Sequence, residues 1–134
     1  MSKEACDRVL LMEDDPAVGE MMEKMLLQLG FDPHWVRRGE HAIQAYRETL
    51  MTGQCYDSVI LDLFVEEGMG GIETLKGLRE LDPNVKALAA TGAMRDQALP
   101  DYTEIGFRTT LAKPFTMNEL SRALQMTVTG VSVE

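Results

Sequence analysis

Short apolar runs alternate with longer amphipathic stretches along this chain. The runs fall near residues 9–12, 34–36, 58–61, 85–90 and 107–112. The first, Val9-Leu10-Leu11-Met12, is nearly all apolar, as expected for a strand that is buried on both faces of a sheet. Each run is followed by a stretch in which apolar residues recur at helical spacing. The pattern therefore predicts five strand–helix units.

Residues at the ends of the amphipathic stretches support this interpretation. Asp15, which is followed by a proline, is predicted to be the N-cap of the first helix. Thr116 and Glu119 are predicted to form a capping box for the last helix. Pro100 interrupts the stretch from 94 to 105, so we expect a short or irregular fourth helix there.

Five strand–helix units predict an α/β fold with a parallel sheet and helices on both of its faces. Right-handed crossovers favour a doubly wound five-stranded sheet with the flavodoxin-like strand order 2-1-3-4-5. We expect one domain over residues 7–128, with residues 1–6 and 129–134 as tails. In such sheets a ligand binds outside the carboxyl ends of the strands, so these ends are the place to look for chemistry.

Polar residues stand at the carboxyl ends of four of the predicted strands. Glu13 and Asp14 follow the first strand and Asp62 ends the third. Thr91 follows the fourth strand and Lys113 follows the fifth. Neighbouring carboxylates repel one another in a partly buried site, and a hard divalent cation relieves this repulsion. A ligand set made only of oxygen atoms predicts Mg²⁺ rather than zinc or copper.

The same residues suit a phosphoryl group. Asp62 can attack phosphorus and become an aspartyl phosphate. Mg²⁺ and Lys113 can neutralise charge on the phosphoryl oxygens. Thr91 can donate a hydrogen bond to one of these oxygens, and Gly92 has no side chain to block access. Asp62, Thr91 and Lys113 are therefore the predicted catalytic residues.

With these residues in this order, the sequence resembles the receiver domain of two-component response regulators over essentially its whole length. The matching residues are Glu13-Asp14, Asp62, Thr91-Gly92 and Lys113-Pro114. The resemblance implies that Asp62 is the phosphoacceptor. It also implies that Asp14 binds Mg²⁺ directly, that Glu13 does so mainly through water, and that the main-chain carbonyl of Phe64 is a further ligand. A cis peptide bond between Lys113 and its proline is expected as well.

The resemblance implies a signalling module that takes a phosphoryl group from a phosphohistidine and slowly hydrolyses it. The expected partner is a histidine kinase or a histidine phosphotransfer domain, and the chain is not an enzyme in the metabolic sense. The alternative is a phosphorylation-independent pseudo-receiver that only binds proteins. A phosphohydrolase is disfavoured because Phe64 stands where those enzymes carry a second acid. A nucleotide-binding module is disfavoured because no P-loop or GxGxxG follows the first strand.

Some positions depart from the common family pattern. Glu66 stands where many receivers have proline, and Thr110 stands where the switch residue is often Tyr or Phe. Without that aromatic side chain, we hypothesise a receiver that mainly relays or stores phosphoryl groups. The GMGG stretch at 68–71 resembles receivers at the C-terminus of hybrid histidine kinases, and whether the chain stands alone is left open.

The methionines of the first helix allow two interpretations. Met21, Met22 and Met25 lie at helical spacing, which favours packing in the core. The alternative is that one or two of them face outward, where receivers dock a helical phosphodonor, because methionine suits adaptable surfaces.

The net charge of the chain limits the classes of partner that it is expected to bind. There are 13 Lys and Arg against 22 Asp and Glu, which gives a formal net charge of −9. Such a chain is poorly suited to the phosphates of nucleic acids or to anionic membrane surfaces. No apolar run is long enough to span a bilayer, and the polar N-terminus does not resemble a signal peptide. We therefore expect a cytoplasmic protein that is a monomer, with a weak dimer as the alternative.

The two cysteines, Cys6 and Cys55, are too few for a disulfide framework or a zinc site. Each lies about two residues before a strand, and these two strands are expected to be adjacent. The cysteines are therefore predicted to be near neighbours at the end of the sheet away from the site. A cytoplasmic location favours free thiols, and whether the two can pair is left open.

Overall fold

Five parallel strands form one sheet in a computed structural model that describes residues 7–63, 68–92 and 102–130. The strand order is β2-β1-β3-β4-β5. The strands are β1 (Arg8–Met12), β2 (Asp32–Val36), β3 (Ser58–Asp62), β4 (Ala87–Thr91) and β5 (Thr109–Ala112). The predicted α/β fold and strand order are confirmed.

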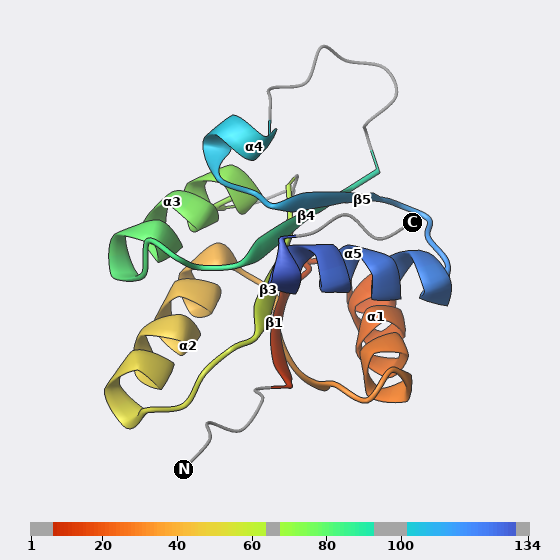
Figure 1. Ribbon diagram of the computed structural model, residues 1–134, viewed down its shortest axis with the longest axis horizontal. Helices are drawn as coiled ribbons and strands as arrows, with labels where there is room; N and C mark the ends of the chain where they lie inside the picture. The colour runs from red at the N-terminus through yellow and green to blue at the C-terminus, as the bar shows by residue number, and fades with distance from the viewer. Residues whose placement is uncertain (1–6, 64–67, 93–101, 131–134) are drawn as a thin grey trace.

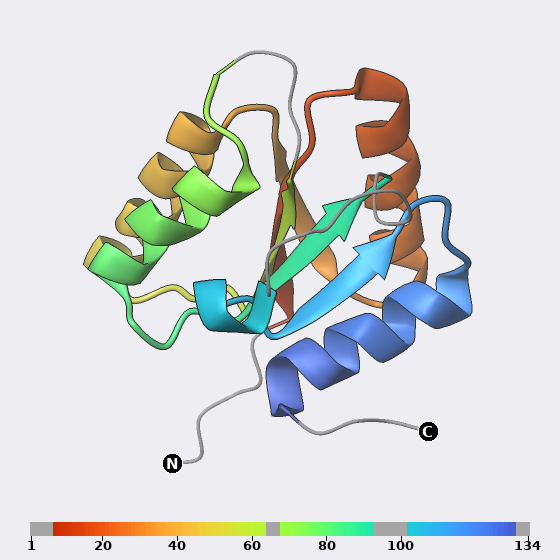
Figure 2. The same ribbon diagram turned by 90° about the horizontal axis from the view of Figure 1, so that it is seen from above.

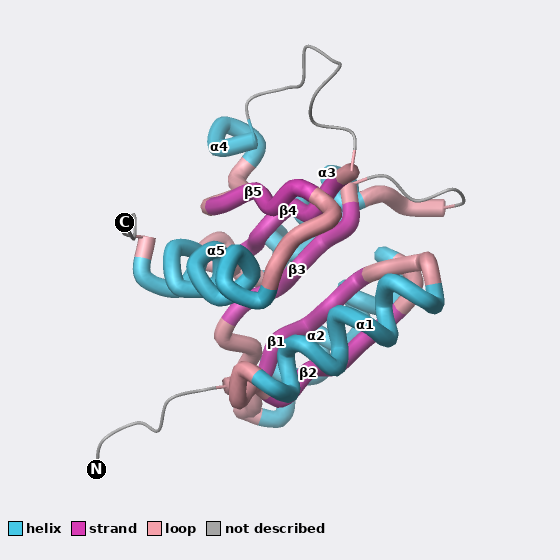
Figure 3. Tube along the Cα trace, turned by 90° about the vertical axis from the view of Figure 1, so that its right-hand side faces the viewer, coloured by secondary structure: helices cyan, strands magenta, loops and turns pink. Residues whose placement is uncertain are grey.

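Helices cover both faces of this sheet. They are α1 (Pro16–Gln28), α2 (Gly39–Thr52), α3 (Gly71–Leu81), α4 (Tyr102–Ile105) and α5 (Met117–Thr129). Helices α1 and α5 lie on one face, and α2 and α3 lie on the other (Figures 1 and 2). Figure 3 shows the sheet behind α1 and α5. None of the helices in the described ranges is long and apolar enough to cross a membrane.

Two cores result from the alternation of side chains along the strands. On β1, Val9 and Leu11 belong to the core under α1 and α5. Leu10 and Met12 belong to the core under α2 and α3. All four side chains are fully buried, which explains why β1 is a nearly continuous apolar run rather than an alternating one.

The expected signals at the chain turns are confirmed. The Asp15 side chain accepts hydrogen bonds from the first main-chain N–H groups of α1. Thr116 and Glu119 form the capping box of α5, and the bond between Lys113 and its proline is cis. Of the stretch 94–105, residues 102–105 are described and form α4, while Pro100 lies outside the described residues.

Helix α2 does not bury every side chain that its spacing suggested. Its spacing predicts that Ile43, Tyr46 and Leu50 point inward. Tyr46 is buried and Ile43 packs against the core, but Leu50 is 50% exposed. The buried stripe continues through Thr49 instead. Because successive helical residues are about 100° apart, Leu50 turns away from the sheet.

Cys55 is disulfide-bonded, so the expectation of a free thiol is wrong for this residue. Cys6, the other cysteine of the sequence, lies outside the described residues. Cys55 lies near the amino end of β3, where the main-chain N–H of Asp57 donates to the Arg8 carbonyl at 2.8 Å. The expectation failed because it rested on an assumed compartment and not on geometry.

Two buried tyrosines differ in how their hydroxyl groups are satisfied. The Tyr46 hydroxyl donates to Oδ2 of Asp82 at 2.6 Å. Burial of the phenol, together with this hydrogen bond, raises the pKa of Tyr46 above its usual value. The Tyr102 hydroxyl is also buried, but it has no hydrogen-bond partner among the described residues.

Tyr46→Phe should lower the free energy of unfolding by about 1–2 kcal/mol near neutral pH, because it removes a hydrogen bond to a carboxylate. Tyr102→Phe is the matched control and should be neutral or slightly stabilising, because it removes an unsatisfied buried group. Urea unfolding measures both. Equal losses of unfolding free energy in the two variants would contradict the view that the Tyr46 hydroxyl makes a stabilising hydrogen bond and the Tyr102 hydroxyl does not.

The effect of Tyr46→Phe should also depend on pH. The pKa of Tyr46 is higher in the folded than in the unfolded chain, so its contribution is fully present below about pH 10. The contribution is lost as the pH rises from there through the folded pKa. Repeating the urea measurement at about pH 11 should therefore show a smaller difference between wild type and variant.

Candidate functional site

The carboxyl ends of four strands meet at one edge of the sheet. Asp62 is the last residue of β3, and Thr91 is the last residue of β4. Glu13 directly follows β1, and Lys113 directly follows β5. Since all the strands are parallel and paired in register, these four residues reach the same edge.

Three carboxylates form a cluster at this edge. Oxygen atoms of Glu13, Asp14 and Asp62 all lie within 4.8 Å of one another. Glu13 is 1% exposed and Asp62 is 5% exposed, while Asp14 is partly buried. Carboxylate oxygens at this spacing are hard ligands whose mutual repulsion a divalent cation relieves, so the cluster fits Mg²⁺.

Lys113 spans the two buried carboxylates. Its ammonium donates to Oε1 of Glu13 at 2.5 Å, and it lies 3.6 Å from Oδ1 of Asp62. Lys113 thus contacts both Asp62 and Glu13, and Glu13 is the nearer partner. An ammonium has three hydrogen-bond donors and one positive charge, so it can contact both carboxylates and neutralise part of their negative charge.

Thr91 and Gly92 complete the edge beside Lys113. Thr91 is fully buried, and its carbonyl accepts a hydrogen bond from the Lys113 main-chain N–H at 2.9 Å. A Cβ atom added to Gly92 would meet nothing nearer than the Cβ of Lys113, at 4.0 Å. Gly92 is exposed, and no other atom of the described ranges would lie within 4 Å of that Cβ.

Glycine is required where α3 begins, close to the phosphoacceptor candidate. A Cβ atom on Gly71 would lie 2.7 Å from the carbonyl oxygen of Asp62. This glycine lets the start of α3 pack directly on the main chain that carries Asp62. Phe64, the predicted carbonyl ligand, and Glu66 lie outside the described residues.

Two contacts from the β2 side were missed from the sequence. The Trp35 indole N–H donates to the Glu13 carbonyl at 2.9 Å. The Arg37 guanidinium donates to the Asp14 carbonyl at 3.0 Å. Both bonds end on main-chain oxygens, which carry no signal of residue type. From the sequence, the predicted strand order showed that β2 would lie beside β1, but it did not show these two hydrogen bonds.

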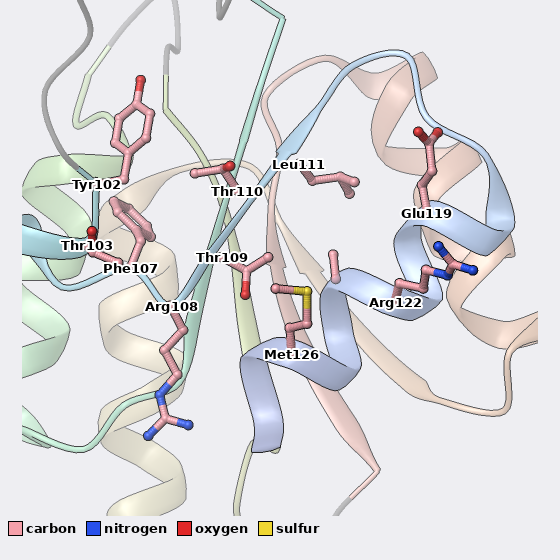
Figure 4. Close-up of a pocket in the computed structure, with 11 residues that line it drawn as sticks. Tyr102, Thr103, Phe107, Arg108, Thr109, Thr110, Leu111, Glu119, Arg122 and Met126 are labelled. Atoms are coloured by element: carbon pink, nitrogen blue, oxygen red, sulfur yellow. The ribbon is translucent and has the colours of Figure 1, made fainter. Parts of the chain in front are cut away.

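A separate hollow of about 510 Å³ lies between α4, β5 and α5 (Figure 4). Thr110 of β5 lines it together with Arg122 and Met126 of α5. No member of the carboxylate cluster lines it, and Lys113 does not either. The hollow is therefore distinct from the acidic edge.

Comparison with protein families gives one assignment for most of the chain. Residues 9–125 match the model of the response regulator receiver domain. Sporulation initiation phosphotransferase F of Bacillus subtilis is 24% identical over 119 residues, which cover 89% of this chain and 91% of that protein. Transcription factor SKN7 of Candida albicans is 32% identical over 112 residues, but the chain spans 19% of its length.

Solved structures show the same fold. The receiver domain of the sensor histidine kinase PA1611 from Pseudomonas aeruginosa PAO1 has a TM-score of 0.80 and 27% identity, covering 92% of this chain and 98% of that one. That crystal structure has a magnesium ion coordinated in its active site cleft. A CheY-like receiver domain from Methylobacillus flagellatus has a TM-score of 0.74 and 29% identity, covering 92% of this chain and 99% of that one.

Lys113→Met should lower the free energy of unfolding by about 3 kcal/mol, because it leaves Glu13 buried without its ammonium partner. The matched control is Lys24→Met, which breaks an exposed pair with Glu20 on α1. An exposed pair contributes at most about 0.5 kcal/mol. Urea unfolding near neutral pH, without divalent cations, measures both variants.

Equal and small losses in the two lysine variants would contradict the view that Lys113 offsets buried charge. A second arm adds Mg²⁺ to the Lys113→Met protein. A cation that binds the folded chain raises its stability, so part of the loss should be recovered.

Proposed function

The chain belongs to the response regulator receiver domain family, and we propose that Asp62 is the residue at which it becomes phosphorylated. The observation that carries the proposal is the cluster of Asp62 with Glu13, Asp14 and Lys113 at the carboxyl edge of the sheet. Asp62 is the member of this cluster that ends the central strand β3, and it faces the ammonium of Lys113.

The proposed reaction is a transfer between two side chains. A carboxylate oxygen of Asp62 attacks the phosphorus of a phosphohistidine on the partner protein. A P–O bond forms, the P–N bond to the imidazole breaks, and the imidazole nitrogen takes a proton from solvent. Slow hydrolysis then removes the phosphoryl group. Water attacks the same phosphorus, the P–O bond to Asp62 breaks, phosphate leaves, and Asp62 returns to a carboxylate.

Lys113 and Thr91 would bind the phosphoryl oxygens. The Lys113 ammonium lies 3.6 Å from Asp62, so it is placed to neutralise charge that arrives there. Thr91 ends the neighbouring strand, and its hydroxyl would donate to one oxygen. Gly92 is exposed and has no side chain, which supports access for the partner's phosphohistidine.

Glu13, Asp14 and Asp62 would hold Mg²⁺, which supplies positive charge for the equatorial oxygens of the phosphoryl group. Asp14 is the least buried of the three and is the proposed direct ligand with Asp62. Glu13 is already bonded to Lys113, which suits a contact made through water. Phe64 remains a proposed carbonyl ligand by its place in the sequence.

The proposed partners are a histidine kinase or a histidine phosphotransfer domain. Met21 on α1 is 44% exposed, which supports the interpretation that this helix offers an adaptable apolar contact to a helical phosphodonor. The chain would catalyse its own phosphorylation and dephosphorylation and no other reaction. A phosphorylation-independent pseudo-receiver remains the alternative function.

Thr110 favours a relay over an output switch. It lines the hollow between α4, β5 and α5, at the position where many receivers carry Tyr or Phe. Threonine has no aromatic ring that could rotate into the space behind Thr91. We therefore propose a receiver, of the kind also found in hybrid kinases, that mainly passes on or stores a phosphoryl group.

Incubation with a small phosphodonor such as acetyl phosphate and Mg²⁺ should add the mass of one phosphoryl group to the chain. Asp62→Asn should abolish this adduct, because an amide is not a nucleophile for phosphorus. Asp57→Asn is the matched control, since Asp57 precedes the opposite end of the same strand. Intact-mass spectrometry provides the readout. An adduct that persists in Asp62→Asn and disappears in Asp57→Asn would contradict the proposal.

Hydrogen exchange tests the relay proposal separately. With Mg²⁺ and beryllofluoride, a mimic of the phosphoryl group, exchange should slow near Asp62 and Thr91. It should change little across the face formed by α4 and by β5 around Thr110. Large changes across that face would contradict a relay without affecting the assignment of Asp62.

A further inference from the structure

A tryptophan on β2 holds the main chain of the acidic pair. The Trp35 indole N–H donates to the Glu13 carbonyl at 2.9 Å, while Arg37 reaches the Asp14 carbonyl from the exposed surface. The Trp35 ring packs against the core under α1 and α5. Its hydrogen bond is therefore shielded from water more than that of Arg37, which strengthens it.

Strand β2 binds both polar groups of the Glu13 main chain. Trp35 pairs with Leu11 in the ladder between β2 and β1. One step further, the Glu13 N–H donates to the Val36 carbonyl at 3.0 Å, and the Glu13 carbonyl accepts from the indole. The peptide planes on either side of Glu13 are thus fixed by one neighbouring strand.

Helix α1 makes room for the indole at Gly19. A Cβ atom on Gly19 would lie 2.1 Å from Cζ2 of Trp35. The indole is rigid, so a side chain at this position must displace it. A helix with glycine in its interior is less stable than one with alanine there, so α1 is less stable at Gly19 in exchange for space for the indole.

We infer that Trp35 is a positioning residue for the metal site, acting through its indole N–H on the Glu13 carbonyl. This inference rests on the proposed function, because it concerns the Mg²⁺ that Glu13, Asp14 and Asp62 would hold. Carboxylates that repel one another tend to separate, and a fixed main chain at Glu13 limits that movement. Outer contacts of this kind typically change metal affinity by about tenfold or more.

The sharpest test removes the N–H and keeps the shape of the ring. Benzothienylalanine at position 35 replaces the indole N–H with sulfur in the full chain. We expect the Mg²⁺ dissociation constant, measured by calorimetry, to rise about tenfold. The thermal unfolding midpoint should fall by only a few degrees, as expected for the loss of one hydrogen bond, so the chain stays folded during the titration. Trp35→Phe, which also lacks the donor, should weaken Mg²⁺ binding at least as much.

A pair of glycine variants tests the same contact without changing Trp35. Gly19→Ala should displace the indole and raise the Mg²⁺ dissociation constant by a similar factor. Gly77→Ala on α3 is the matched control, because its Cβ would meet the flexible end of Ile43, 2.6 Å away. That contact lies on the other face of the sheet, so Mg²⁺ affinity should not change.

Fluorescence gives a second readout, because Trp35 is the sole tryptophan of the sequence. Its emission should change on adding Mg²⁺ at the concentrations that saturate the calorimetric signal. Unchanged Mg²⁺ affinity in both the benzothienylalanine protein and Gly19→Ala would overturn this inference and leave the proposed function standing. A folded wild-type chain that binds no Mg²⁺ in the millimolar range would overturn both.

Discussion

Repulsion among three carboxylates at one edge of the sheet is the constraint on which this structure depends. Glu13 and Asp62 are buried, and with Asp14 they place oxygen atoms within 4.8 Å of one another. Like charges this close raise the free energy of the folded state in a medium of low dielectric constant. Lys113 offsets part of that cost from β5. The remaining negative charge suits a divalent cation and, with it, the oxygens of a phosphoryl group.

The strand order explains how each part reaches this edge. Strands β1 and β3 are neighbours, so the carboxylates come from adjacent strand ends. Strand β5 is two places from β3, and the long side chain of Lys113 covers that distance. Strand β2, on the far side of β1, contributes no charge to the cluster but holds its main chain through Trp35. One sheet therefore supplies the acids, the ammonium and the support for the acids from different strands.

Features that depend on residue type at a fixed place along a strand were predictable from the sequence. The position of Asp62 at the end of a buried run is an example, because parallel strands bring such ends together. The role of Trp35 was not predictable, because it depends on a main-chain carbonyl and on the missing side chain of Gly19. Leu50 was misplaced because a helical stripe can shift by one residue without changing its period. The disulfide of Cys55 was missed because the sequence does not determine the redox environment.

An amide NMR spectrum recorded with Mg²⁺ and then with beryllofluoride tests the central claim most directly. If Asp62 accepts a phosphoryl group with the help of a cation, the amides of Asp14, Asp62, Thr91 and Lys113 should shift. The full change should need both additions and should be absent in Asp62→Ala. A folded wild-type chain whose spectrum does not respond to the two additions would contradict the account. The pseudo-receiver would then be the better description of this chain.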